Sequence, residues 1–317
     1  MIHLRLIVPP DLVHEVLGVL ERAPDVTNVW RLPNAATKPA GDLVSCDVAK
    51  EEGSSVVAEL RALGLGDRGS IAVESVDASV SDVAVRAELA APGAPADAIV
   101  WEEVQGRVEE SATLSVSFLL LMTIATMISA IGIITDSIVL IIGGMVVGPE
   151  FGPLAGISVA LVEGRPRLAA RSLQALAVGF PLAIAGAAFL TLVLIGTGVA
   201  PDALLSTDRE LTLFISDPNW ASAIVAVLAG AVGMLALTGA KSGVLVGVLI
   251  SVTTLPAASN VGVAAVYGNW SEAGGAAAQL AINVTAIAVT GVVVLLLDRR
   301  AQRRRELARA RSSRPAR

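Results

Sequence analysis

Cysteine and histidine, the residues that most often bind metals, are almost absent from this chain. It has one cysteine, Cys46, and two histidines, His3 and His14, among 317 residues. A single cysteine excludes a disulfide scaffold and any multi-cysteine metal site. Both histidines lie near the N-terminus, which excludes a histidine-based metal site in the hydrophobic remainder of the chain. We therefore expect neither a metal nor a cofactor.

Charged and aromatic residues are also scarce. Charged residues make up 16% of the chain and aromatic residues 3%, whereas 54% are hydrophobic and the mean hydropathy is +0.71. Soluble domains carry about 25% charged residues, so the composition predicts a membrane protein and excludes a soluble enzyme. The net charge is −10 over residues 1–110, −4 over 111–298 and +8 over 299–317. These differences predict an acidic soluble domain, a membrane core and a basic tail.

The first 80 residues alternate between strand and helix patterns. This βαββαβ order is typical of the ferredoxin-like split unit, and we predict a ferredoxin-like cytoplasmic domain at 1–80. Three roles are open to it: ligand sensing, oligomerisation or capping of the membrane part. Residues 81–110 are predicted to be a linker and an amphipathic connecting helix that starts at Asp97. The predicted strands are 1–8, 26–32, 43–48 and 71–76, with a turn at 33–41, one helix capped by Asp11 and a second helix over 56–63.

Six hydrophobic segments follow, each near the ~20 residues that a spanning helix needs. They predict an α-helical membrane domain at 111–298, and the basic cytoplasmic tail at 299–317 comes after it. The segments are 113–134, 137–162, 169–198, 220–238, 242–267 and 273–297.

The charges between these segments predict the orientation of the chain. Cytoplasmic loops are enriched in lysine and arginine, and every short loop agrees with one arrangement of six spans with both termini in the cytoplasm. We therefore predict a multi-pass protein of the bacterial cytoplasmic (plasma) membrane. The arginine-rich tail is expected to contact anionic lipid of the bilayer and no nucleic acid. The cations assigned to the cytoplasmic side are Arg165, Arg167, Arg171, Lys241, Arg299 and Arg300.

Two of the six segments are interrupted near their centres. The second contains Gly148-Pro149-Glu150-Phe151-Gly152-Pro153, and the fifth contains Thr253-Thr254-Leu255-Pro256 followed by Ser259-Asn260. Proline removes a backbone donor and clashes with the preceding turn, so both helices are expected to kink or unwind there. The breaks match when the two halves are superposed with an offset of 105 residues. Three spans per half predict two inverted repeats, in which paired broken helices indicate a midplane transport site.

The same residues resemble a known family. Ser129-Ala-Ile-Gly-Ile-Ile-Thr-Asp-Ser-Ile, Ile142-Gly-Gly-Met-Val-Val-Gly-Pro-Glu-Phe-Gly-Pro and Leu255-Pro-Ala-Ala-Ser-Asn-Val-Gly look like the bacterial "uncharacterised hydrophobic domain" integral membrane protein family. The resemblance covers residues 110–297. That family is a domain of unknown function, so the resemblance brings no activity with it. Many relatives have an apolar residue where Glu150 stands and a second proline where Ala257 stands.

Glu150 is the strongest site candidate, because a carboxylate in mid-membrane is costly unless it is solvated, paired or protonated. A structural role in the broken helix and a direct role in handling an ion or proton are both open. The last three segments offer no basic residue at matching depth, so we expect protonation or a bound cation. The predicted binding residues are Glu150, Pro149, Thr253, Thr254, Ser259, Asn260 and Asn283, and the predicted helix-break residues are Gly148, Gly152, Pro153 and Pro256.

These features predict a membrane transporter, or a channel of related architecture, for a small ion or polar solute, with proton or cation coupling at Glu150. The alternative is a sensory or scaffolding membrane protein whose N-terminal domain binds a ligand or partner, although an anchor needs neither paired helix breaks nor a buried acid. The exposed sheet edges of the first domain predict a homo-oligomer. We expect no enzyme and no catalytic residues, because the chain has neither a phosphate-binding loop nor a serine nucleophile elbow.

Overall fold

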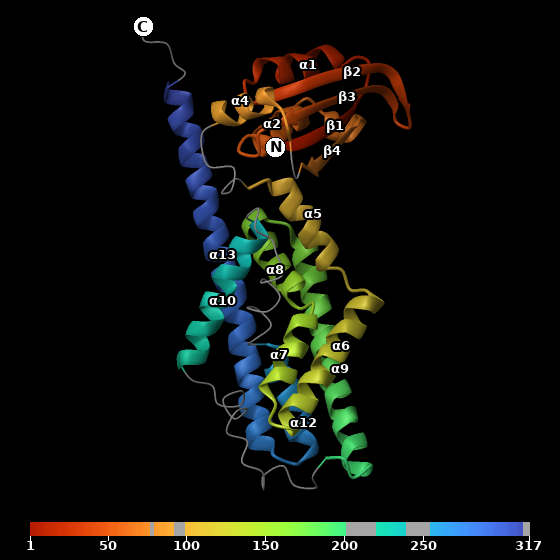
Figure 1. The fold of residues 1–317 in the computed structure, drawn as a ribbon, viewed down its shortest axis with the longest axis vertical. Helices are drawn as coiled ribbons and strands as arrows, with labels where there is room; N and C mark the ends of the chain where they lie inside the picture. The colour runs from red at the N-terminus through yellow and green to blue at the C-terminus, as the bar shows by residue number, and fades with distance from the viewer. Residues whose placement is uncertain (77–78, 92–98, 201–219, 239–253, 313–317) are drawn as a thin grey trace. The chain divides into compact units, whose positions relative to one another are not determined.

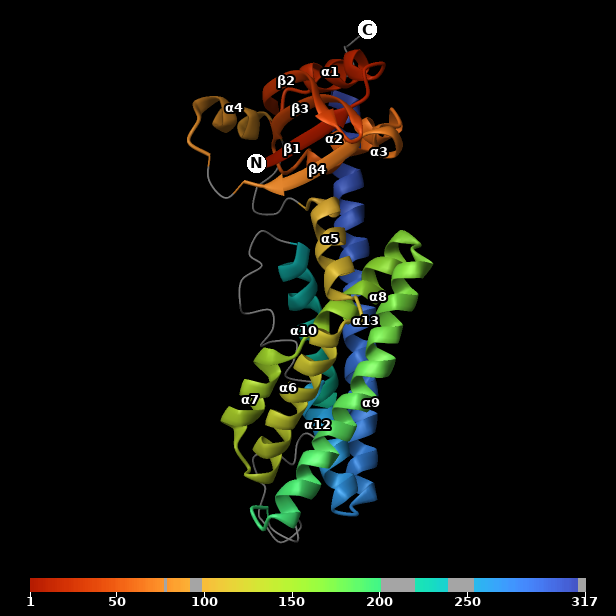
Figure 2. The same cartoon turned by 90° about the vertical axis from the view of Figure 1, so that its right-hand side faces the viewer.

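The computed structural model describes residues 1–76, 79–91, 99–200, 220–238 and 254–312, except for the side chains of 302–312. Within these residues the chain forms two compact units. The first unit contains Met1–Gly106, and the second begins at Arg107 and contains the long apolar helices. Figures 1 and 2 show the elements of each unit from two directions.

The first unit is built on a four-stranded sheet. Neighbouring strands pair antiparallel in the order β2-β3-β1-β4. The elements follow the predicted βαββαβ order with one short additional helix. They are β1 (Ile2–Val8), α1 (Val13–Arg22), β2 (Val26–Thr37), β3 (Ala40–Val48), α2 (Gly53–Ala62), α3 (Leu65–Arg68) and β4 (Ser70–Ser75).

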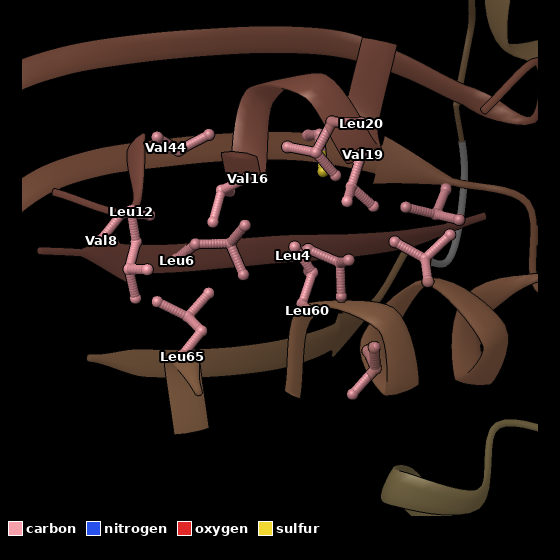
Figure 3. Packing of buried hydrophobic residues seen from close by; sticks show 14 of the residues in the cluster. Leu4, Leu6, Val8, Leu12, Val16, Val19, Leu20, Val44, Leu60 and Leu65 are labelled. Atoms are coloured by element: carbon pink, nitrogen blue, oxygen red, sulfur yellow. The ribbon is translucent and has the colours of Figure 1, made fainter. Parts of the chain in front are cut away.

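One face of this sheet carries the hydrophobic core of the first unit. Leu4 and Leu6 of β1 are buried on the same face because side chains alternate along a strand. They pack with the apolar stripes of α1 and α2, which include Val16 and Leu60 (Figure 3). Cys46 lies in the same core, and burial raises the pKa of its thiol to about 12.

Two predicted details of this unit are wrong. The predicted turn at 33–41 is almost entirely strand, with only a tight turn between β2 and β3. Pro33 does not end the strand, because β2 lies at the sheet edge, where a missing N–H is tolerated. Asp11 does not cap α1. Leu12 occupies the N-cap position, and Asp11 forms an ion pair of 2.8 Å with Arg68 instead.

The predicted linker after residue 80 contains a helix, α4 (Asp82–Ala90). Ser81 caps it by accepting a hydrogen bond from the Ala84 N–H, and Ala84 packs with Met1. The alanine-rich composition, which indicated a linker, favours a helix here because alanine has the highest helix propensity. The predicted connecting helix is present as α5 (Trp101–Ser111), with Val104 and Val108 buried.

The second unit consists of helices. Four stretches are long and apolar enough to cross a membrane: α6, α9, α10 and Trp270–Ala301 of α13. The number is five if the bent pair α7 and α8 is one span. These numbers concern the described residues. The helices are α6 (Val116–Ile134), α7 (Ile138–Val147), α8 (Phe151–Glu163), α9 (Pro166–Gly196), α10 (Trp220–Thr238), α12 (Leu255–Val266) and α13 (Trp270–Ser312).

The described residues do not test the prediction of six spans. The fifth predicted segment, 242–267, is described only from Thr254 onward. Its helix α12 has 12 residues, which at 1.5 Å per residue gives about 18 Å against the ~30 Å of a bilayer core. α12 alone is therefore a half-length helix.

α12 lies inside the second unit and contacts α6, α7, α9 and α13. All residues from 255 to 260 are buried. Gly262 lets α12 approach α9 closely, because a Cβ at this position would lie 2.6 Å from the Ile184 carbonyl oxygen. Ser259 Oγ donates a hydrogen bond of 3.0 Å to the Thr126 carbonyl of α6. This packing holds the N-terminal end of α12 in the interior of the unit.

Candidate functional site

The first predicted helix break is present between α7 and α8. α7 ends at Val147, α8 begins at Phe151, and the two axes are bent by 51°. Pro149 lies in the connection. Pro153 lies in the first turn of α8, where a proline is tolerated because the first N–H groups of a helix have no intrahelical acceptor. Gly148 allows close packing, since a Cβ there would overlap Leu255 Cδ1.

The described part of the second predicted break lies in contact with the first break. Thr254 Oγ1 donates a hydrogen bond of 2.8 Å to Glu150 Oε1, and both side chains are fully buried. Leu255, the first residue of α12, packs against Gly148. The break between α7 and α8 therefore meets the N-terminal end of α12, although Glu150 and Thr254 are 104 positions apart in the chain. The second predicted break is not tested, because residues 239–253 lie outside the described residues.

α8 and α12 leave this contact in opposite directions. At the far end of α8, Glu163 pairs with Arg299 in the later part of α13. Beyond the first turn of α12, Asn260 bonds to Glu272 in the first turn of α13. Because α13 is one continuous helix, these contacts mark opposite ends of the helical unit (Figures 1 and 2). The N-terminal ends of two half-length helices thus face each other at the break.

These helix ends make the surroundings of Glu150 electropositive. Each N-terminus carries roughly +0.5 elementary charge, so two together offset about one negative charge. Few free backbone donors remain, because Pro153 and Pro256 have no N–H and the Gly152 N–H bonds to the Pro149 carbonyl over 3.4 Å. Glu150 and Thr254 thus lie at the facing N-terminal ends of α8 and α12.

The other predicted site residues are spread along the unit. Ser259 bonds to α6, as described above, and does not point to the break. The Asn260 side-chain nitrogen donates to Glu272 Oε1 over 3.0 Å. Asn283 Oδ1 accepts a hydrogen bond of 2.8 Å from Gln279 Nε2 within α13. Thr253 lies outside the described residues.

Gly152 and Pro256 have packing roles at the starts of α8 and α12. A Cβ on Gly152 would lie 2.9 Å from the carbonyl oxygen of Ser111 at the end of α5, so this glycine permits close contact with that helix. Pro256 is buried at the second position of α12, where its ring fits the helix start.

A charged group at the turn between α8 and α9 was not predicted as a structural feature. Arg165 forms ion pairs with Glu109 and, at 3.8 Å, with Glu163. Arg299 reaches the same Glu163 carboxylate at 3.2 Å and donates to the Val162 carbonyl over 3.0 Å. The sequence signal was present, because Arg165 and Arg299 were both assigned to the cytoplasmic side. What sequence reasoning missed is the shared buried acid between them.

The first unit contains a polar cluster that sequence reasoning also missed. His3 Nδ1 lies 2.7 Å from Asp47 Oδ1, and His3 Nε2 lies 2.7 Å from Ser45 Oγ. Serine, histidine and aspartate have this order in hydrolytic triads. Ser45, however, is only 1% exposed, and its hydroxyl also lies 3.1 Å from the Leu4 carbonyl oxygen. A substrate does not reach that hydroxyl in this arrangement, so the cluster joins β1 to β3.

The described residues thus have the architecture of an α-helical membrane protein with an N-terminal α+β unit. A family model described as a domain of unknown function (DUF389) matches residues 145–289, which include Glu150 and Thr254. The chain is similar to the Uncharacterized protein MJ0678 of Methanocaldococcus jannaschii, with 27% identity over 198 residues. The alignment covers 62% of this chain and 58% of that relative. No solved structure matches the chain.

Proposed function

We propose that this protein is a membrane transporter, or a channel of related architecture, for a small ion or polar solute. The observation that carries the proposal is the contact between buried Glu150 and Thr254 at the facing ends of α8 and α12. A continuous helix satisfies its own backbone in a membrane, and a buried acid adds cost. A protein that only anchors a domain to the membrane needs neither a broken helix nor a buried acid. Transporters use broken helices to form polar sites.

The proposal includes six spans in two inverted repeats, with both termini in the bacterial cytoplasm. The meeting of Arg165 and Arg299 at Glu163 supports it, because both cations then belong to one side. Single cysteines at Arg167 and Ser271 test it in cells with a membrane-impermeant maleimide, since Cys46 is buried. Ser271→Cys should be labelled in intact cells and Arg167→Cys only after permeabilisation. The opposite labelling pattern would show that the protein has the reverse orientation in the membrane.

Glu150 is the residue at which a proton or cation would couple to transport. Glu150→Gln retains an acceptor for the Thr254 hydroxyl and removes the charge. In vesicles that contain the purified protein, a solute screen should find a flux whose pH or cation dependence is lost in this variant. Glu110→Gln, which changes an exposed acid at the end of α5, is the matched control. If the flux of Glu150→Gln kept the pH or cation dependence of the wild type, Glu150 would have a structural role only.

The competing function is a sensory or scaffolding role of the first unit. It would be favoured if the wild-type protein moved no solute in the screen while the first unit bound a ligand or partner.

We also propose a homo-oligomer. β2 is a sheet edge and exposes Trp30 and Leu32, at 46% and 49%, and such edges readily pair with another copy. Native mass spectrometry in mild detergent should show more than one subunit. Trp30→Lys with Leu32→Lys should reduce the oligomer fraction. A monomeric wild-type protein would contradict the proposal.

A further inference from the structure

Two buried amide oxygens of the second unit have no hydrogen-bond partner among the described residues. They are Asn260 Oδ1 and Gln279 Oε1. Asn260 is 1% exposed and Gln279 is 5% exposed. A buried polar group without a partner costs about 1–3 kcal/mol, and native proteins leave few of them unsatisfied. These two atoms are therefore the candidate contacts for a ligand.

The hydrogen bonds around these amides identify the remaining atoms as acceptors. Glu272 Oε1 receives a hydrogen bond from the side chain of Asn260. An ionised carboxylate only accepts, so the amide must turn its nitrogen toward Glu272 and keep its oxygen for another partner. Gln279 and Asn283 share one hydrogen bond. In such a bond the carbonyl oxygen of the donating amide is not used, so it remains available as an acceptor. The ligand must therefore satisfy oxygen atoms.

We group both amides with polar side chains of α12, α13 and the start of α8 under the name polar row. On α13, Gln279 and Asn283 share a buried stripe with Ala276 and Ile287, as their spacing requires. Ile287 is in the same hydrophobic cluster as Leu255, the neighbour of Thr254. Eleven positions separate Glu272 from Asn283, which corresponds to about 16 Å of helix. The polar row consists of Glu272, Asn260, Gln279, Asn283, Thr254 and Glu150.

The position of Glu272 follows from the start of α13. Asn269 is the residue before this helix, and its Oδ1 accepts a hydrogen bond of 3.2 Å from the Glu272 N–H. Asn269 Nδ2 donates to Glu272 Oε2 over 2.9 Å. This capping arrangement fixes the carboxylate at the turn between α12 and α13, which is one end of the polar row.

The chemistry of the row favours a small hard cation. Its ends are carboxylates and its middle carries amide carbonyl oxygens, which are the ligands that hard cations prefer. An anion would lie beside Glu150, and the prolines at the helix starts leave it few N–H donors. The described residues contain no group of three acidic, histidine or cysteine side chains that could hold a metal ion. A monovalent cation therefore fits better than a divalent one.

We propose that the polar row binds a small monovalent cation of the Na⁺ class, with Asn260 Oδ1 and Gln279 Oε1 as ligands, on a route between Glu272 and Glu150. The transport part rests on the proposed function and names its substrate or coupling ion. The binding part is measurable without any flux.

Cation binding is tested with the full-length protein in detergent. Because a ligand that binds only the folded state raises its stability, the unfolding temperature should rise when NaCl replaces choline chloride at constant ionic strength. Gln279→Met removes the oxygen at similar size and should weaken the apparent Na⁺ affinity about tenfold or more. Gln279→Glu adds negative charge and should strengthen it. Ser172→Ala is the matched control, because Ser172 Oγ is also buried without a partner but lies against Gly156, away from the row.

The outcomes separate the cation site from the transport function. A wild-type protein that shows no Na⁺-dependent stabilisation overturns the site, and so does an unchanged affinity in both Gln279 variants. Flux of radioactive Na⁺ and of the screened solutes into vesicles is measured separately. Solute flux without Na⁺ binding leaves the transporter proposal standing and overturns the cation row. Na⁺ binding without any flux leaves the cation site standing and overturns the transporter proposal.

Discussion

Thr254 Oγ1 donates a 2.8 Å hydrogen bond to Glu150 Oε1, and this bond joins the residues that precede α12 and α8. Both residues occupy N-cap positions, yet neither side chain caps its own helix within the described structure. Each side chain binds the other instead. The two helix starts are thus linked through their side chains, and a change at one should affect the position of the other.

Thr254→Val should destabilise the helical unit by about 1–3 kcal/mol, because it leaves a buried carboxylate oxygen without its donor. Thr191→Val is the matched control. Thr191 is also fully buried, but its hydroxyl bonds only to the Ala187 carbonyl of its own helix, so a smaller loss is expected. Chemical unfolding in detergent measures both. Equal losses would show that the bond to Glu150 adds no stability.

Gly148→Ala should move the start of α12 away from the break between α7 and α8. A Cβ at Gly148 would overlap Leu255 Cδ1 and Glu150 Oε2, so α12 must shift. Gly143→Ala is the control in the same helix, because a Cβ there meets nothing within 4 Å. We expect Gly148→Ala to lower the unfolding temperature. Gly143→Ala should not lower it, because alanine has a higher helix propensity than glycine. Leu255→Ala should partly restore Gly148→Ala, and the absence of any rescue would contradict the contact.

Glu163→Ala should cost more stability than Glu109→Ala. The Glu163 side chain is 5% exposed and faces Arg165 and Arg299, whereas the Glu109 side chain is 42% exposed and faces Arg165 alone. Loss of Glu163 should cost about 2 kcal/mol, between the ~0–1 of an exposed pair and the ~3–5 of a fully buried one. Thermal unfolding of each variant, with Arg299→Met in a double-mutant cycle, measures the coupling. Additive losses would mean that the pair with Arg299 contributes nothing.

Periodic patterns predicted the first unit well because they report directly on burial. Alternation along β1 and helical spacing in α1 both describe which side chains face the core. The four strands occur in the expected order, although β2 and β3 extend into the predicted turn. The pattern failed at α4, since its short alanine-rich sequence is held by a cap and by packing on Met1. It also failed at Pro33, because edge position is a property of the sheet and not of the segment.

The break between α7 and α8 was predictable from proline chemistry, but its partner was not. Pro149 disrupts a helix wherever it occurs inside one, so this interruption follows from the sequence. That Thr254 meets Glu150, or that Asn260 reaches Glu272, depends on how helices pack. The His3 cluster likewise depends on strand register, in which His3 is paired with Asp47. No motif spacing encodes such a pairing.

The stability of the first unit should depend on pH through Asp42. The Asn34 N–H donates to Asp42 Oδ1 over 2.8 Å and Arg31 Nε donates to Oδ2 over 2.6 Å, and these contacts hold the pKa of Asp42 below its ordinary value. A carboxyl whose folded pKa is lowered stabilises the fold above its unfolded pKa of about 3.9, and that contribution disappears as pH falls through the folded pKa. Asp42→Asn should therefore destabilise the unit at neutral pH, and its difference from wild type should shrink below about pH 4.

Cys46 reports on this unit within the intact protein, because it is the chain's one cysteine and is buried in the core. Its thiol, with a pKa raised to about 12 by burial, should react with dithiodipyridine only when the unit opens. The rate of this reaction in a urea series, at neutral and acidic pH, gives the opening free energy for wild type and Asp42→Asn. Asp67→Asn, which changes an exposed acid of α3, controls for net charge. A difference between Asp42→Asn and wild type that stays constant into strong acid would show that the Asp42 contacts do not stabilise the fold through the carboxylate charge.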